Sequence, residues 1–246
     1  MIAVGLSAQD AKASRRAVDF HGTTFHKSDW MLTGRAADGA PTIFMVEQPP
    51  ESVLAPHFHM TNQFQLFVAG HGRIGGHPLA AVTIHYAGAF TGYGPIVAGE
   101  DGIAYLTIRP GHEPGANFIA TSGHLMRKGP KRGATATPVT VAGVAELRAL
   151  PAPAVTVAIP LAEDGLGASV HALPPHAPLD PIRSTAAEGD FLIVLAGALD
   201  AENGISRRDL ESLFIPSAAP WPRLVAGADG AQVVLLSTPP KHPRYR

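Results

Sequence analysis

Two histidines placed two residues apart give this chain its clearest chemical signal. His57 and His59 lie in the segment PHFHMTNQFQLFVAG, and on an extended strand residues i and i+2 point to the same face. Neutral imidazoles bind Zn, Fe, Mn, Ni or Cu, so two rings on one face could chelate a divalent transition metal. The alternative is a pocket in which the two rings are hydrogen-bonded and hold no metal.

A glutamine and a glycine follow this pair at regular spacing. Gln63 comes three residues after the HxH string, and Gly70 follows after six more. The pattern resembles the first motif of the cupin superfamily, where HxH is followed by three or four residues, a glutamate, six residues and a glycine. The chain departs from that motif at two places, because Glu51 replaces its leading glycine and Gln63 replaces its glutamate.

The resemblance implies a bicupin, which is a duplicated small β-barrel, with a divalent metal such as Fe, Mn, Ni or Zn in the first barrel. Cupin enzymes of this layout include dioxygenases, isomerases, lyases and decarboxylases that act on small organic acids or aromatics. Gln63 would then give the metal a neutral oxygen ligand, or would orient a ligand or water in the pocket. The second cupin motif, which normally supplies a third histidine, is not recoverable after Gly88.

Two other histidines compete for the position of third metal ligand. His85 lies in the predicted strand VTIHY, and one face of that strand points into the barrel. His77, in GGHPLA, is the competing candidate. For each of them, the alternative is a histidine that lies at the surface or only supports the site.

Four further residues are weaker candidates for the same pocket. Tyr93 and Gln65 are the candidate catalytic residues; Tyr93 could act as a general acid or substrate donor, or could simply pack at the barrel mouth. Arg35, in TGRAADG, could clamp a carboxylate or lie in a hairpin turn. Arg109 ends a predicted strand and is expected to face solvent.

Two pairs of segments repeat along the chain in the same order. FQLFVAG (64–70) is similar to FLIVLAG (191–197), and IVAGEDG (96–102) is similar to LVAGADG (224–230). The two matches keep nearly the same spacing, which indicates a tandem of similar domains. We therefore predict an N-terminal cupin barrel over residues 1–130 with the candidate metal pocket, and a degenerate C-terminal cupin barrel over residues 131–246.

The repeat also indicates whether the fold depends on the two histidines. A shift of 127 residues pairs His57 with Ser184, His59 with Ala186 and Gln63 with Asp190. Because the second copy keeps the strand and the turn without HxH, the fold does not require those histidines. This favours a site in the first domain only, and leaves the second as a structural domain, a lid or the surface of a homodimer.

The elements that must position these side chains are short strands. Segments such as 42–46, 82–86, 103–108, 155–159 and 232–237 are β-branched or aromatic, and turn residues separate them. Helical candidates are few, at 8–17, 143–150 and 206–213. With 26 glycines and 23 prolines in 246 residues, the sequence predicts an all-β fold of two antiparallel jelly-roll barrels.

Composition excludes several classes of function. The net charge of −1 gives no reason to expect nucleic acid or an anionic membrane as a partner, and no apolar stretch is long enough to span a bilayer. The absence of cysteine excludes disulfides, thiolate metal sites and cysteine nucleophiles. The start of the chain does not have the pattern of a secretory signal, so we expect a cytoplasmic protein.

The sequence also lacks the phosphate-loop, dinucleotide-binding and serine-nucleophile motifs. What remains is a metal-binding cupin, which could be an enzyme of the dioxygenase, isomerase or lyase type acting on a small organic substrate. The alternative is a cupin that binds a small molecule without turning it over.

Overall fold

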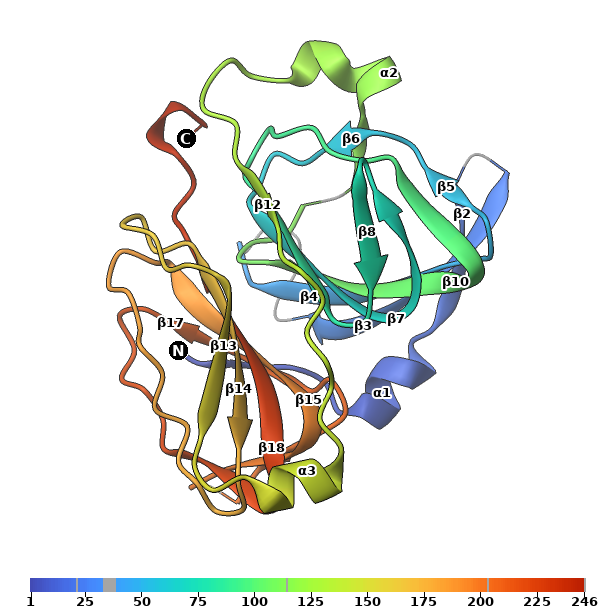
Figure 1. The fold of residues 1–246 in the computed structure, drawn as a ribbon. Coiled ribbons are helices and arrows are strands. Elements are labelled where there is room, and N and C mark those ends of the chain that lie inside the picture. Colours follow the sequence, from blue (N-terminus) through green and yellow to red (C-terminus); the bar gives the residue numbers. More distant parts are fainter. Residues whose placement is uncertain (21, 33–38, 114, 203, 246) are drawn as a thin grey trace. The chain divides into compact units, whose positions relative to one another are not determined.

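The computed structural model describes residues 1–20, 22–32, 39–113, 115–202 and 204–245, and the chain folds into two compact units (Figure 1). One unit, which we call the N-terminal barrel, contains Ala11–Pro138 and Lys241–Arg246. The other, the C-terminal barrel, contains Met1–Asp10 and Val139–Pro240. Each unit thus includes a short segment from the far end of the sequence. The predicted division into residues 1–130 and 131–246 did not include this exchange of terminal segments.

The N-terminal barrel is built on an antiparallel sheet with the strand order β12-β9-β7-β10-β4-β3-β2 (Figure 1). The bounds of these strands are β2 Arg16–Phe20, β3 Thr23–Leu32, β4 Thr42–Gln48, β7 Gln63–Ile74, β9 Thr83–Ala87, β10 Ile96–Arg109 and β12 Gly133–Thr135. Strands β5 (Val53–Leu54) and β8 (His77–Ala80) pair with β10 and β7. Strand β6 (His57–Phe58) pairs with β11 (Asn117–Phe118), which places the two-histidine segment beside the loop that follows β10.

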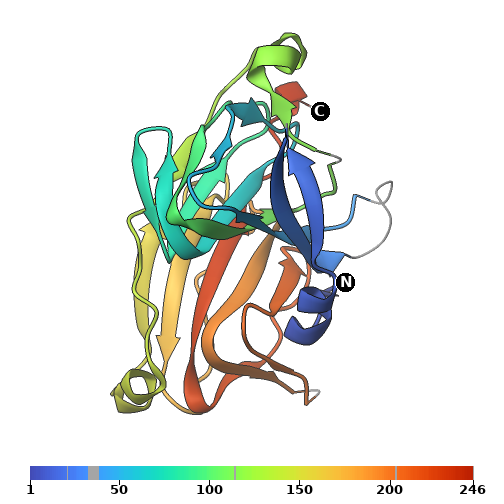
Figure 2. The ribbon, with the colours of Figure 1, turned by 90° about the vertical axis from the view of Figure 1, so that its right-hand side faces the viewer.

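The C-terminal barrel has the strand order β1-β17-β15-β18-β14-β13, and its two long strands β15 and β18 can be followed in Figure 2. The bounds are β1 Ala3–Val4, β13 Ala154–Ile159, β14 Gly167–Leu173, β15 Gly189–Ala201, β16 Ser206–Arg207, β17 Ser212–Pro216 and β18 Leu224–Thr238. The repeated segments lie on β7 and β15 and on β10 and β18. The two orders therefore correspond at six positions, and β2 has no counterpart in the C-terminal order. The prediction of an all-β fold with two related antiparallel sheets is confirmed.

Helices are short and lie outside the sheets. They are α1 (Ala8–Ala13), α2 (Ile119–Ser122) and α3 (Val144–Ala149), with 3-10 turns at Gly123–Leu125 and Pro243–Tyr245. The expected helix over 206–213 is wrong, because Ser206–Arg207 pairs with β15 and Ser212 begins β17. Among the described residues, no helix has the length and apolar character needed to cross a membrane.

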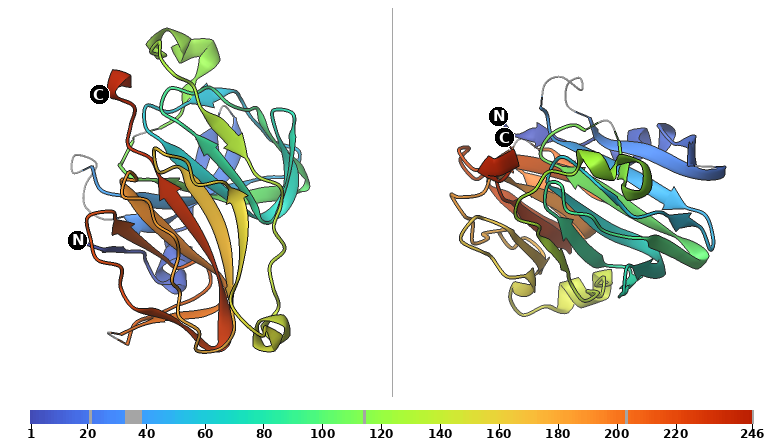
Figure 3. Two further views of the ribbon diagram at one scale, coloured as in Figure 1. Left: turned by 60° about the vertical axis from the view of Figure 1, so that its left-hand side comes forward. Right: turned by 90° about the horizontal axis from the view of Figure 1, so that it is seen from above.

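The last segment of the chain packs into the N-terminal barrel, and its course can be followed in red in Figure 3. Tyr245 is 3% exposed, and its ring centroid lies 4.9 Å from that of Phe90. Its hydroxyl donates to the carbonyl oxygen of Pro130 at 2.7 Å. The backbone N–H of Phe90 in turn donates to the carbonyl oxygen of His59 at 2.6 Å, so this segment supports the loop beside the two histidines.

Matching glycines mark the same bend in both barrels. Gly70 has φ +73° and Gly197 has φ +70°. A Cβ at Gly70 would lie 2.2 Å from the carbonyl oxygen of Gly102, and one at Gly197 would lie 2.1 Å from that of Gly230. Both positions therefore require glycine for two reasons, the left-handed backbone and the close approach of the neighbouring strand.

We expect Gly70→Ala to lower the free energy of unfolding by about 2–3 kcal/mol, because a left-handed alanine is strained and the facing backbone must also move. Urea unfolding followed by the fluorescence of Trp30, which lies in the same barrel, would measure this loss in a Trp221→Phe background. The control is Gly22→Ala, where φ is +84° and nothing lies within 4 Å of the added Cβ. An equal effect of both substitutions would show that the close contact costs nothing.

Candidate ligand site in the N-terminal barrel

The interior of the N-terminal barrel changes from apolar to polar along two paired strands. Phe67 faces Tyr105 across β7 and β10, and two residues further on Gln65 faces Thr107. Beyond the last pair, Phe64 with Ile108, Gln63 begins β7 and Arg109 ends β10, and a hydrogen bond joins their side chains. Because residues i and i+2 share a face, the strands carry a buried aromatic pair at one level and buried polar groups at the next two. All of these polar side chains are at most 3% exposed.

His57 and His59 lie at the polar end of this interior. They are 2% and 5% exposed, and their ring centroids are 5.3 Å apart. The Nδ1 atom of His57 lies 2.8 Å from the carbonyl oxygen of Ala55, and that of His59 lies 3.1 Å from a carboxylate oxygen of Glu113. Since both partners are acceptors, we assign the ring proton to Nδ1 in each case. This leaves Nε2 of each ring as the nitrogen that carries the lone pair.

Burial keeps both imidazoles neutral. Burial, and then the neighbouring His59, lower the pKa of His57 to about 3. Burial and the charge of Arg109 lower the pKa of His59. An ordinary imidazole pKa predicts that metal affinity falls as the pH drops through about 6–6.5. In this pocket the His57 ring is already neutral across that range, so its protonation would oppose a metal only in more acidic solution.

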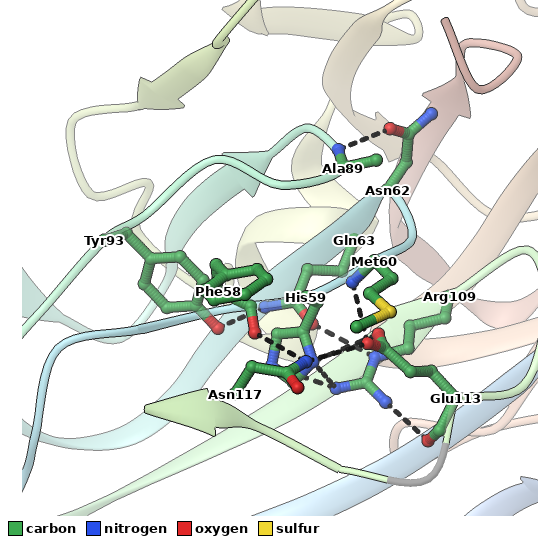
Figure 4. A network of polar contacts seen from close by, with 10 residues as sticks. All are labelled: Phe58, His59, Met60, Asn62, Gln63, Ala89, Tyr93, Arg109, Glu113 and Asn117. Atoms are coloured by element: carbon green, nitrogen blue, oxygen red, sulfur yellow. Dashed lines mark hydrogen bonds and ion pairs between the residues drawn. The ribbon is translucent and has the colours of Figure 1, made fainter. Parts of the chain in front are cut away.

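Arg109 is the hub of the polar network drawn in Figure 4. It is 3% exposed, which corrects the sequence-based expectation that it faces solvent. Its Nε donates to Oε1 of Gln63 at 3.1 Å, and its Nη1 donates to the backbone oxygen of Glu113 at 3.1 Å. Its Nη2 lies 3.1 Å from Nδ1 and 3.2 Å from Nε2 of His59, so the guanidinium lies against the nitrogen-bearing side of that ring.

The carboxylate of Glu113 balances this buried charge. Its side chain is 8% exposed, and it accepts from His59 Nδ1 and, at 2.7 Å, from the backbone N–H of Met60. Burial alone would raise the pKa of Glu113, but the contact with His59, the Met60 N–H and the charge of Arg109 hold it below its usual value. The cluster therefore contains one cation and one anion, as a buried site requires.

Tyr93 connects the remaining candidates. Gln63 donates through Nε2 to the Tyr93 hydroxyl, and the Tyr93 ring lies 4.4 Å from His57 and 5.3 Å from His85, centroid to centroid. Burial raises the pKa of Tyr93, so its hydroxyl keeps its proton. The Oε1 atom of Gln65 is buried without a hydrogen-bond partner among the described residues.

His85 and His77 line a different cavity. That second cavity, of about 400 Å³, contains His77, His85, Tyr93 and Thr135 in its wall, but not His57 or His59. The Nδ1 atom of His85 lies 2.8 Å from the Thr135 hydroxyl, and burial lowers the pKa of His85 to about 4. The structure thus brings together His57, His59, Gln63 and Tyr93, and leaves His85 on the other side of Tyr93. Arg35 lies outside the described residues.

A cavity of about 450 Å³ opens beside the His57–Arg109 network. This size is within the range of small-molecule sites in proteins. Its polar wall includes Lys27, His57, His59, Gln65, Tyr93 and Arg109. Lys27 Nζ lies 3.9 Å and Arg109 Cζ lies 5.3 Å from the centroid of Phe44, so two cations face one aromatic ring.

The charge of Lys27 lacks a direct counter-ion. Among the described residues no carboxylate forms an ion pair with Lys27, and the nearby Asp29 is bound by both terminal nitrogens of Arg16 at 2.9 and 3.1 Å. Burial, and then the charges of Arg109 and Arg16, lower the pKa of Lys27 to about 8. The Arg109–Glu113 pair is balanced, so the cavity has a surplus positive charge below that pH.

Comparisons with solved structures define the fold family. Over 96% of its length the chain is similar to 77% of an oxalate decarboxylase mutant from Bacillus subtilis, with a TM-score of 0.57 and 9% sequence identity. Over 93% of its length it is similar to 78% of a quercetin 2,3-dioxygenase from Acinetobacter baumannii, with a TM-score of 0.50 and 13% identity. Both neighbours are cupin-type proteins. The chain has the cupin fold.

No model of a protein family and no curated protein matches the sequence. The solved structures nevertheless confirm, at the level of fold, the cupin resemblance that the HxH segment indicates. At these identities the likeness carries no information on the reaction, so function must be argued from the cupin barrel that holds the two histidines.

The donor set of this cupin barrel fits a divalent metal only in part. The Nδ1 atoms of His57 and His59 are held by an oxygen acceptor each, which is how metal-binding histidines are usually oriented. Against this, Arg109 lies on His59 and binds the oxygen of Gln63. Within the described ranges, no three histidine, aspartate or glutamate side chains are placed to hold a metal ion. As arranged here, the residues do not complete a metal site.

Proposed function

We propose that this chain is a cupin protein that binds a small organic anion inside its N-terminal barrel. The observation that carries the proposal is the 450 Å³ cavity with Lys27 and Arg109 in its wall and surplus positive charge. The fold supports it, because the interior of a small β-barrel is a preformed place for one small ligand. A carboxylate between the two cations would relieve their mutual repulsion and replace the water lost on binding.

The remaining polar groups would orient the ligand. Gln65 Oε1 has no hydrogen-bond partner among the described residues, and it can accept from a hydroxyl or amine of the ligand. The Nε2 atom of His57 has a lone pair that can accept in the same way. The aromatic rings of Phe44 and Tyr93 offer apolar contact to the carbon skeleton. We therefore expect a carboxylate that also carries a hydrogen-bond donor to bind better than a plain one.

The test is a calorimetric titration of protein treated with EDTA, using acetate, oxalate, malonate, succinate and benzoate against their uncharged amides. We expect carboxylates to bind and amides to bind at least about tenfold more weakly, the scale of a charge-assisted hydrogen bond. Affinity should fall as the pH rises through about 8, because Lys27 then loses its proton. Lys27→Gln should weaken binding about tenfold and remove this pH dependence.

The control is Lys128→Gln, which removes an exposed lysine from the same barrel. If amides bind as well as carboxylates, or if Lys27→Gln leaves both affinity and pH profile unchanged, the proposal of an anion site is wrong.

A second candidate function is a metal-dependent enzyme of the dioxygenase, isomerase or lyase type, with Fe, Mn, Ni or Zn bound by Nε2 of His57 and His59. The orientation of both rings by Ala55 and Glu113 favours it. Metal analysis of purified and reloaded protein, followed by assays of O₂ uptake and CO₂ release, separates the two candidates. The homodimer stays a prediction, which measurement of the mass in solution would test.

A further inference from the structure

We propose that Arg109 is the resident cation of this site: its guanidinium binds the acceptor groups of His59 and Gln63 that a divalent metal would need, so the barrel excludes the metal. The inference rests on the proposed function only in that the anion would bind in the same cavity. It concerns whether the Arg109 guanidinium or a metal ion supplies the positive charge beside His59. It is tested by metal binding in the absence of any organic ligand.

The contacts carry the first step. Of the three predicted metal ligands near one another, His57, His59 and Gln63, two are already in contact with the guanidinium. Gln63 is fixed at both ends, because its oxygen accepts from Arg109 and its nitrogen donates to Tyr93. A metal on this oxygen would therefore lie beside the Arg109 guanidinium that already donates to it. Only His57 keeps a nitrogen that Arg109 does not contact.

Charge carries the second step. Arg109 and Glu113 are balanced, and the cavity also contains Lys27. A divalent ion on Nε2 of His59 would add two positive charges beside a guanidinium that lies 3.2 Å from the same nitrogen. The surrounding side chains are almost fully buried, so water screens this repulsion weakly. With Arg109 removed, the cluster would instead have one uncompensated carboxylate, which attracts a metal.

The position of Arg109 carries the third step, because the side chain is held in place. Its Nε, Nη1 and Nη2 each have a partner, and the residue is 3% exposed at the end of β10. Turning it away would leave a buried cation and two buried acceptors without partners. An arginine held in this way acts as a fixed charge rather than as a gate.

The C-terminal barrel contains a similar arrangement of side chains. Asp190, which corresponds to Gln63 in the repeat, is fully buried and lies opposite Ser237 across β15 and β18. Asp190 also binds an arginine, since Nε of Arg183 lies 2.7 Å from its carboxylate. In both barrels the side-chain oxygen at this position therefore accepts from the Nε of an arginine.

The experiment compares metal binding of the full chain with that of Arg109→Gln. Both proteins are stripped with EDTA and equilibrated with Co²⁺, Zn²⁺, Ni²⁺ or Mn²⁺, and bound ions are counted after dialysis. We expect the natural chain to retain no more ion than the double variant His57→Ala, His59→Ala. We expect Arg109→Gln to bind at least about tenfold more tightly, with a Co²⁺ absorption spectrum that indicates imidazole ligands. Adding His57→Ala to Arg109→Gln should abolish this gain.

Three outcomes would overturn the inference. In the first, the natural chain retains an ion that it loses with His57→Ala and His59→Ala. In the second, Arg109→Gln folds but gains no affinity for the metal. In the third, Arg109→Lys, which keeps the charge, binds the metal as well as Arg109→Gln does. If Arg109→Gln does not fold, retention by the natural chain and by Arg109→Lys still decides. Carboxylate binding by the stripped natural chain is measured separately, so its failure would remove the proposed function and leave the metal result standing.

Discussion

Asp190→Ala is expected to lower the free energy of unfolding of the C-terminal barrel by about 3–5 kcal/mol. This is the cost of removing one partner of a buried ion pair while the other stays in place. Asp190 is fully buried, and its carboxylate accepts from Arg183 at 2.7 Å and from the Ser237 hydroxyl at 2.6 Å. The side chain of Arg183 is 20% exposed, and its guanidinium packs over the ring of Trp221. Without the carboxylate, it would keep its charge in a mostly buried position with only backbone oxygens as partners.

Each barrel contains one of the two tryptophans, which allows the loss to be assigned. Trp30→Phe leaves Trp221 as the only indole, and its fluorescence then follows urea unfolding of the C-terminal barrel alone. The control is Asp229→Ala, which removes an exposed partner of Arg148 in the same barrel and should cost less than about 1 kcal/mol. Similar losses at the two sites would contradict the role given to Asp190.

Mild acid is expected to destabilise the N-terminal barrel strongly. Burial lowers the pKa of His57 to about 3 and that of His85 to about 4, from 6.5 in an unfolded chain. Below pH 6.5 the unfolded state therefore binds protons that the folded state does not, so stability is complete above that pH and falls as the pH drops toward the folded values. At about 1.4 kcal/mol per pH unit for each histidine, the two together cost about 4 kcal/mol at pH 5.

Urea unfolding at pH 7, 6 and 5, followed by the fluorescence of Trp30 in a Trp221→Phe background, measures this dependence. His57→Gln should remove about half of the difference between pH 7 and pH 5, because glutamine does not titrate. His124→Gln, at an exposed position, is the matched control. Equal stability of the natural chain at pH 7 and pH 5 would show that the two rings are not buried as neutral groups.

The repeat and the HxH segment were sufficient to predict the fold. Strand register depends on local patterns, and the glycines at 70 and 197 recur because the same close approach of backbone recurs in both barrels. The proximity of His57, His59 and Gln63 is expected from the spacing of the motif, whereas Tyr93 was only a weaker candidate for the same pocket. These features are visible in sequence because neighbouring residues or a repeated segment determine them.

Arg109 and Glu113 were missed for a physical reason. A charged residue at the end of a strand usually faces water. The alternation of side chains puts Arg109 on the same face as Thr107 and Tyr105, but it does not say which face of the strand is buried. Only the pairing of β10 with β7 brings it within hydrogen-bond distance of Gln63. Glu113 lies in a loop, where no periodicity applies, and reaches His59 through the loop's path past β6. The separation of His85 by the Tyr93 ring also depends on packing rather than on spacing.

The segment Lys241–Arg246, which belongs to the N-terminal barrel, sets the order in which a nascent chain can complete its structure. Phe90 lies under the ring of Tyr245, yet the ribosome must make residues 139–240 before that ring exists. At about 5–20 residues per second, this delay lasts roughly 5–20 s. Through that interval Phe90 and the loop beside His59 lack their final cover. The barrel that is translated first thus receives its last segment only after residues 139–240 have been synthesised, and its site becomes complete no earlier than that.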